Sequence, residues 1–122
     1  MPAGDFAQQI EGSHYAGFNL LLSDGESLLY CSNRDGEPRA LPPGIYGLSN
    51  HLLDSPWPKL VQARQRFTAA LQHLPEEAAF FELLADQTIV EDDKLPQTGV
   101  PLEWERLLSA VFVKSENYGT RA

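Results

Sequence analysis

Two short apolar runs joined by a turn sequence constrain the fold most. The runs, GFNLLL at 17–22 and SLLYCS at 27–32, are rich in leucine and aromatic residues. The residues between and around them, SDGE at 23–26, have Asp-Gly at the centre, a pair that favours the positive-φ backbone of a tight hairpin turn. The sequence therefore predicts an antiparallel pair of strands.

The segment after the second run favours turns. NRDGEPRALPPG at 33–44 is dense in Gly, Pro, Asn and Asp, which turns require. Asn33–Gly36 has the composition of a turn after a strand, and we assign it no chemistry. A third short strand is expected at Ile45–Leu48.

Helical periodicity begins in the middle of the chain. Apolar residues recur at intervals of three or four from residue 60 onward, and Pro58 suits the first turn of a helix. These signals predict a helix over residues 58–73. A second helix should open at Pro75 and end near Asp86, because the two glutamates after the proline favour the positive end of a helix dipole.

The two ends of the chain complete a mixed architecture. LEWERLLSAVF at 102–112 is amphipathic and predicts a third helix, while residues 1–14 are either flexible or a short helix. Strands followed by helices are typical of an α+β fold, in which helices pack on one face of an antiparallel sheet. A chain of 122 residues is expected to form a single domain.

Charge and cysteine content exclude several classes of partner. Nine Lys and Arg against seventeen Asp and Glu give a net charge of -8, which repels nucleic acid and anionic membrane surfaces. No apolar run approaches the ~18 residues that a membrane span needs. The single cysteine, Cys31, cannot form an internal disulfide, so we expect a reducing, cytoplasmic location.

The residues that could carry metal or nucleophilic chemistry are scattered. His14, His51 and His73 lie far apart with no shared ligand spacing, so no metal site is expected. Cys31 lies in an apolar strand, where a buried thiol without an activating partner is favoured over a nucleophile.

Two segments place polar donors just beyond a glycine-containing run, where backbone can approach a ligand. The first is Ser49-Asn50, and the second ends in Thr120-Arg121. Amide and guanidinium donors suit an oxyanion or a carboxylate. Composition alone favours Asn50 as a helix cap or left-handed turn residue, and Arg121 as part of a frayed terminus.

Four stretches carry a resemblance to a known family: YAGFNLLLSDGESLLYCSNR at 15–34, LPPGIYGLSNHLLDSPWPK at 41–59, LPQTGVPLEWERLLSAVFV at 95–113 and YGTR at 118–121. In this order they resemble the transport and Golgi organisation protein 2 family, also called the NRDE family. The resemblance implies an N-terminal-nucleophile (Ntn) hydrolase-like αββα sandwich. It also implies that this chain is an incomplete domain, a middle-to-C-terminal piece.

The resemblance further implies roles for individual residues. Ntn hydrolases of the cysteine type carry their nucleophile directly after the initiator methionine, whereas this sequence has Pro2. Asn50, with Ser49, resembles the strand end that stabilises the oxyanion. Arg121, with Thr120 beside it, resembles an arginine that lines the same pocket.

Two functions follow from that resemblance. One is hydrolysis of an amide or thioester, which we do not expect of this chain alone because the thiol is missing. The alternative is a non-catalytic module that binds a small molecule, either haem or an acyl-CoA-like ligand; no other cofactor is expected. The exposed strand edges of an incomplete sheet would also permit self-association.

Overall fold

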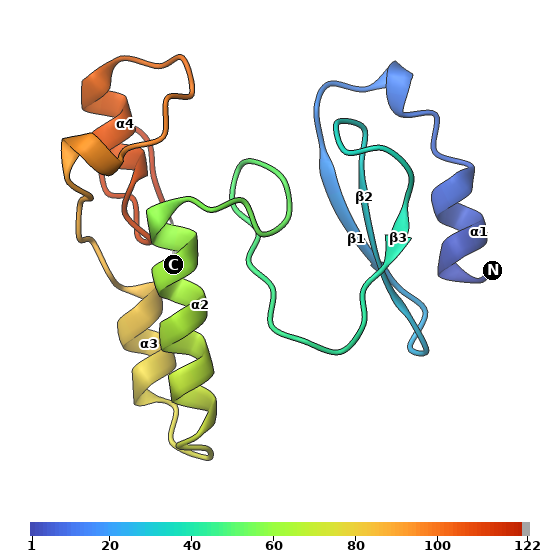
Figure 1. The fold of residues 1–122 in the computed structure, drawn as a ribbon, viewed down its shortest axis with the longest axis horizontal. Helices are drawn as coiled ribbons and strands as arrows, with labels where there is room; N and C mark the ends of the chain where they lie inside the picture. Colours follow the sequence, from blue (N-terminus) through green and yellow to red (C-terminus); the bar gives the residue numbers. More distant parts are fainter. Residues whose placement is uncertain (121–122) are drawn as a thin grey trace. The chain divides into compact units, whose positions relative to one another are not determined.

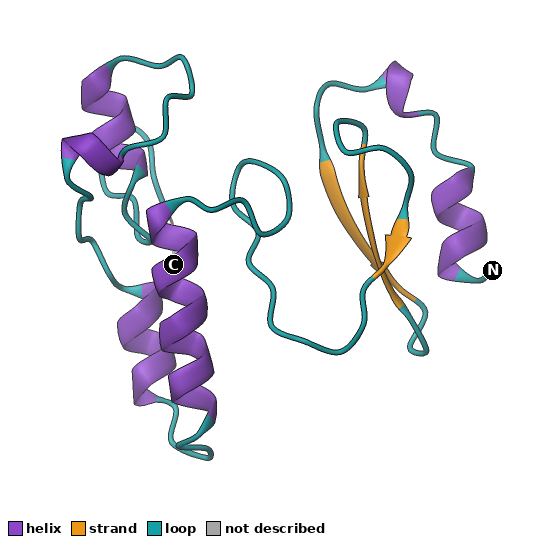
Figure 2. Cartoon of the chain, in the orientation of Figure 1, coloured by secondary structure: helices purple, strands orange, loops and turns teal. Residues whose placement is uncertain are grey.

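The computed structural model describes residues 1–120. The chain divides into two compact units, residues 1–53 and residues 54 onward, and each is described by itself. The first unit contains a three-stranded antiparallel sheet with a short helix, and the second contains the longer helices (Figures 1 and 2). The α+β class is confirmed, whereas the single domain and the αββα sandwich stay predictions.

The predicted hairpin is the centre of the first unit. Strand β1 (Asn19–Ser23) pairs antiparallel with β2 (Leu28–Ser32) over all five residues of each. In the turn, Gly25 has a φ of 88°, a value at which a side chain would be strained. The Asp24 carboxylate accepts the backbone N–H of Ser27 at 2.8 Å, which closes the turn.

The third strand lies elsewhere than predicted. Strand β3 is Arg39–Ala40 and pairs with β2, while Ile45–Leu48 forms no strand. Pairing ends where the Leu41 N–H donates to the Leu28 carbonyl at 2.8 Å. Pro42 and Pro43 follow directly and have no N–H to continue the ladder, which explains why the strand stops before the apolar run.

One face of the sheet is covered by helix α1 (Ala3–Gln8), which is followed by a 3-10 turn at Gly12–His14. Its small residues Ala3 and Ala7 are buried against Leu29 and Cys31 of β2, with partly buried leucines of β1 packed alongside. Figure 1 shows this helix beside the sheet. Side chains alternate between the two faces of a strand, so Leu29 and Cys31 share the face that α1 covers.

The opposite face is organised around Tyr30, whose side chain is only 1% exposed. Its hydroxyl donates to Asn19 Oδ1 at 2.7 Å and accepts the backbone N–H of Leu53 at 3.2 Å. The Arg39 guanidinium lies 4.9 Å from the centre of the ring. These contacts tie the end of the first unit to the sheet.

Along its outer side, β1 pairs with no other strand in the part of the chain that the structure describes. An unpaired edge presents N–H and C=O groups that can pair with another strand. Self-association through this edge therefore stays a prediction.

Acid should loosen the contact between α1 and the hairpin. The Ala3 N–H donates to Asp24 Oδ2 at 2.9 Å, and this bond and those of the turn hold the pKa of the Asp24 carboxyl well below its ordinary value. A lowered folded-state pKa means that the stabilisation is present at neutral pH and is lost as pH falls below about 4. The free energy of unfolding of the first unit, measured by denaturant titration from about pH 6 to about pH 2, should fall with pH, because unfolding takes up a proton at Asp24 once the pH is below the ordinary carboxyl pKa.

Two variants test this assignment. Asp24→Asn should lower the free energy of unfolding already at neutral pH and should weaken its dependence on pH. The exposed Glu37→Gln should behave as the unmodified chain. An unchanged loss of stability with falling pH in Asp24→Asn would assign the acid sensitivity to another group.

The second unit contains the three predicted helices, each shorter than expected. They are α2 (Pro58–Leu71), α3 (Ala78–Leu84) and α4 (Leu102–Leu108). Helices α2 and α3 pack together, with the rings of Phe67 and Phe80 in edge-to-face contact at 5.2 Å. Helix α3 begins at Ala78 because the chain first turns at residues 72–75, where the Glu76 N–H donates to the His73 carbonyl at 2.9 Å, so Pro75 lies in the turn instead of opening the helix.

Polar contacts secure α4 and the loop before it, which contains a 3-10 turn at Asp92–Lys94. The buried Glu105 carboxylate accepts both the N–H and the hydroxyl of Thr98, at 2.6 and 2.7 Å. Lys59 donates to the Leu108 carbonyl at 2.7 Å, and burial lowers the pKa of that lysine. Within residues 1–120, no helix has the length and apolar character to cross a membrane.

Candidate functional site

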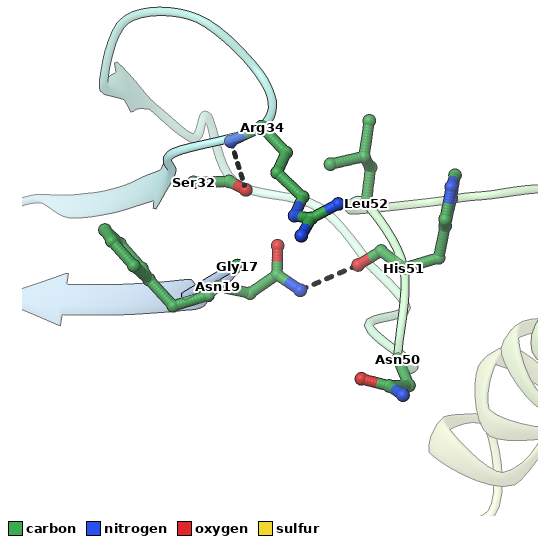
Figure 3. A pocket seen from close by; sticks show the side chains of 8 residues that line it. Gly17, Asn19, Ser32, Arg34, Asn50, His51 and Leu52 are labelled. Atoms are coloured by element: carbon green, nitrogen blue, oxygen red, sulfur yellow. Dashed lines mark hydrogen bonds between the residues drawn. The ribbon is translucent and has the colours of Figure 1, made fainter. Parts of the chain in front are cut away.

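A hollow of about 490 Å³ lies in the first unit, where β1 begins and β2 ends (Figure 3). Three segments that are distant in sequence form it, and their side chains carry amide, hydroxyl, imidazole and guanidinium groups. The lining residues are Gly17, Phe18, Asn19, Ser32, Arg34, Asn50, His51 and Leu52. No carboxylate is among them, although the chain as a whole is acidic.

Asn50 lines this hollow, as the sequence led us to consider. It does not cap a helix, because Trp57 occupies that position before α2. Its φ is not positive, so the left-handed turn interpretation is also wrong. Among the described residues no hydrogen bond occupies its side-chain amide, which leaves both N–H donors for a ligand. Ser49 is half-buried and is not part of the lining.

Asn19 and Tyr30 position the segment that carries Asn50. The Asn19 amide nitrogen donates to the His51 carbonyl at 2.8 Å (Figure 3), while its oxygen accepts the Tyr30 hydroxyl. Since Tyr30 also binds the Leu53 N–H, the backbone on the C-terminal side of Asn50 is held at two points. Both side chains therefore have a structural task, and sequence analysis had assigned neither of them to the site.

Arg34 is the charged group of the hollow, and sequence analysis assigned it no chemistry. Its backbone N–H binds the Ser32 hydroxyl at 3.2 Å. The guanidinium lies close against Gly17: a Cβ at position 17 would be 2.1 Å from the Arg34 Nε. Only glycine permits this approach, and the pairing of an arginine with a glycine seventeen residues away leaves no local signal.

Asn33 fixes the loop that brings Gly17 to that place. Its side-chain nitrogen donates to the carbonyls of Gly12, Tyr15 and Ala16, and its oxygen accepts the Phe18 N–H at 2.9 Å. The two N–H groups of the amide are shared among three carbonyls, and together these contacts from one side chain hold the loop in place. Position 33 is thus a structural anchor for the site and more than a turn residue.

Similarity to known proteins identifies the family. A family model described as Transport and Golgi organisation 2 matches residues 3–122. The chain belongs to this family. It is 38% identical to the Transport and Golgi organization protein 2 homolog of Bos taurus and 35% identical to the corresponding Mus musculus protein, over 91% of the chain in each case. It spans about half the length of the curated relatives it matches, 46% of each.

The other residues predicted for a Transport and Golgi organisation 2 site lie in the second unit or beyond the described part. Thr120 is engaged in a turn, where its N–H donates to the Val113 carbonyl at 2.7 Å and its hydroxyl accepts the Val113 N–H at 3.1 Å. Arg121 lies outside the described residues. The convergence of Thr120 and Arg121 with Asn50 on one pocket therefore stays a prediction.

The remaining candidates for chemistry are the Cys31 thiol and a metal site. Cys31 is 4% exposed, and burial raises the pKa of its thiol, so it is not poised as a nucleophile. Within residues 1–120, no three His, Cys, Asp or Glu side chains gather closely enough to hold a metal ion.

Proposed function

We propose that the first unit supplies the ligand-holding part of a site for a carbonyl compound, an amide or a thioester, with Ntn-hydrolase-like chemistry. The observation that carries this proposal is the Asn50 amide, which lines the hollow and forms no hydrogen bond with the described residues. Such an amide can donate to a carbonyl oxygen, and more strongly to the oxyanion that forms when the carbonyl is attacked.

The proposed division of labour follows from the residues present. Asn19 and Tyr30 hold the backbone of Asn50 in place, so little reorganisation is needed when a ligand arrives. The buried Cys31 is unsuited to attack a carbonyl. Any attacking thiol would have to come from outside these 122 residues, and without it the site binds and does not turn over.

Binding and turnover can be measured separately. A panel of small neutral amides and thioesters should bind the chain alone, and Asn50→Ala should weaken binding by about 3- to 10-fold through the lost hydrogen bond. Adding the N-terminal half of a full-length relative as a separate polypeptide should produce turnover, which Asn50→Ala should lower by about 100-fold. Gln8→Ala, an exposed amide on α1, should change neither quantity.

The measurements distinguish a hydrolase from a binding module. If neither preparation binds or hydrolyses any member of the panel, the proposed function is wrong. Binding by the chain alone with no turnover in the mixture would leave a binding module and exclude the hydrolase.

A non-catalytic ligand site is the second candidate, and the lining decides between its two possible ligands. Haem requires apolar walls against both faces of its ring, whereas only Phe18 and Leu52 are apolar here; these residues fit haem poorly. An acyl-CoA-like ligand fits better, because its thioester carbonyl would meet Asn50. A haem titration followed in the Soret region should show unsaturable uptake; saturation near one equivalent would reverse this preference.

A further inference from the structure

We propose that Arg34 makes the hollow an oxyanion subsite, so that the ligand held by Asn50 also carries a carboxylate or a phosphate. This inference rests on the proposed function and adds the class of ligand. It follows from the pairing of arginines along the chain, the charge of the lining and the placement of the guanidinium.

The arginines of this chain are otherwise matched with carboxylates. Every other described arginine forms an ion pair with an aspartate: Arg39 with Asp35, Arg64 with Asp54, Arg66 with Asp86 and Arg106 with Asp92. Within residues 1–120, Arg34 has no such partner. In a chain with nearly twice as many acidic as basic residues, a guanidinium without a carboxylate beside it indicates that the anion is supplied from outside.

The walls around Arg34 are free of negative charge. The hollow described above has no carboxylate, and neither has an adjoining hollow of about 510 Å³ that shares Gly17 and Arg34 with it. The residues of this second hollow are Gly12, Ser13, Tyr15, Ala16, Gly17, Asn33 and Arg34. A positive group between two carboxylate-free hollows makes this region locally attractive to anions despite the negative charge of the chain.

The guanidinium also lies against backbone before any ligand arrives. It lies against the backbone of Gly17, which Asn33 fixes through the loop, and in the view of Figure 3 it is drawn above the hydrogen bond between Asn19 and His51. A planar guanidinium presents a fork of N–H donors that matches two oxygens of a carboxylate or phosphate. Arg34 would then hold the anionic end of a ligand whose carbonyl meets Asn50.

Anion binding can be followed directly by nuclear magnetic resonance. The isotope-labelled chain is titrated with inorganic phosphate and, separately, with succinate, and both the Gly17 amide and the Arg34 Nε–H should shift and saturate. Arg34→Gln should weaken binding by about 10- to 100-fold, because charge-assisted hydrogen bonds are lost. Arg34→Lys keeps the charge without the fork of donors, so its anion affinity should lie between those of the unmodified chain and Arg34→Gln. Arg66→Gln, which removes an arginine paired with Asp86, should bind as the unmodified chain does.

Gly17→Ala provides a test that leaves the arginine in place. The new Cβ would displace the guanidinium, which is the flexible end of a side chain, so the sheet should fold while anion affinity falls. Saturation by phosphate alone or by succinate alone would identify the anionic group.

The inference is overturned if no shift saturates, or if Arg34→Gln binds anions as tightly as the unmodified chain. If the chain binds neutral amides through Asn50 but binds no anion, this inference is wrong and the proposed function stands. If the chain binds neither an anion nor a neutral amide, the proposed function is wrong as well.

Discussion

Tyr30→Ala is expected to lower the free energy of unfolding of the first unit by about 3–5 kcal/mol, the range found when a buried aromatic side chain is truncated. Tyr30 is the most completely buried large side chain among the described residues, at 1% exposed. Its removal leaves a cavity on the sheet face opposite α1 and also removes the hydroxyl that links Asn19 to Leu53.

Tyr30→Phe separates the packing from the hydrogen bonds. It keeps the ring but leaves Asn19 Oδ1 and the Leu53 N–H without the hydroxyl, at an expected cost of about 1–3 kcal/mol. Denaturant titration followed by far-ultraviolet circular dichroism, with hydrogen exchange at the β1 and β2 amides, measures both variants. Tyr15→Phe is the control, since that ring is 64% exposed, and should change stability by less than about 0.5 kcal/mol.

The two variants also test how Asn50 is positioned. If Tyr30 holds the segment after Asn50, Tyr30→Phe should weaken ligand binding at temperatures where the sheet is still folded. A phenylalanine variant as stable as the unmodified chain would show that the hydroxyl bonds contribute nothing to the first unit.

Gly119→Ala is expected to destabilise the last turn of the second unit by about 1–3 kcal/mol. Gly119 has a φ of 142°, and an added Cβ would lie 2.2 Å from the carbonyl oxygen of Val113. Both the strained backbone and this contact oppose the substitution. The same carbonyl accepts the Thr120 N–H, so moving it would break the bond that holds Thr120.

Thermal unfolding and hydrogen exchange of the Thr120 amide check this expectation. Exchange at Thr120 should accelerate even at temperatures where the helices are intact. Gly99→Ala is the matched control, because Gly99 has a φ of 90° with open space around it; it should show the backbone cost alone, about 1–2 kcal/mol. Equal effects at the two glycines would mean that the Val113 contact is relieved without cost.

Elements coded by neighbouring residues could be predicted. The hairpin follows from the Asp-Gly turn and the two apolar runs, and the helices follow from spacing and proline positions. The third strand was misplaced because an apolar run at Ile45–Leu48 satisfies a local criterion, whereas pairing with β2 depends on what the chain meets after its turn. Arg39–Ala40 meets β2 first, and two prolines then end the ladder.

The residues of the candidate site likewise divide into those that the local sequence marks and those that it does not. Asn50 could be singled out from its place beyond a glycine-containing run and from the family resemblance. Arg34 could not, because its significance lies in the absence of a carboxylate partner within the described residues and in its contact with Gly17. Asn33 could not either, because its hydrogen bonds reach residues fifteen to twenty-one positions away.

The sequence by itself determined the hairpin, the three longer helices, the acidic character and the membership of the Transport and Golgi organisation 2 family, since short-range propensity and motif order carry that information. Only the tertiary structure decided which of its polar residues meet. Tyr30 and Asn19 bind backbone more than twenty residues ahead, and those bonds bring Asn50 and Arg34 to one hollow. Such long-range hydrogen bonds depend on how the whole unit packs, so no local pattern records them.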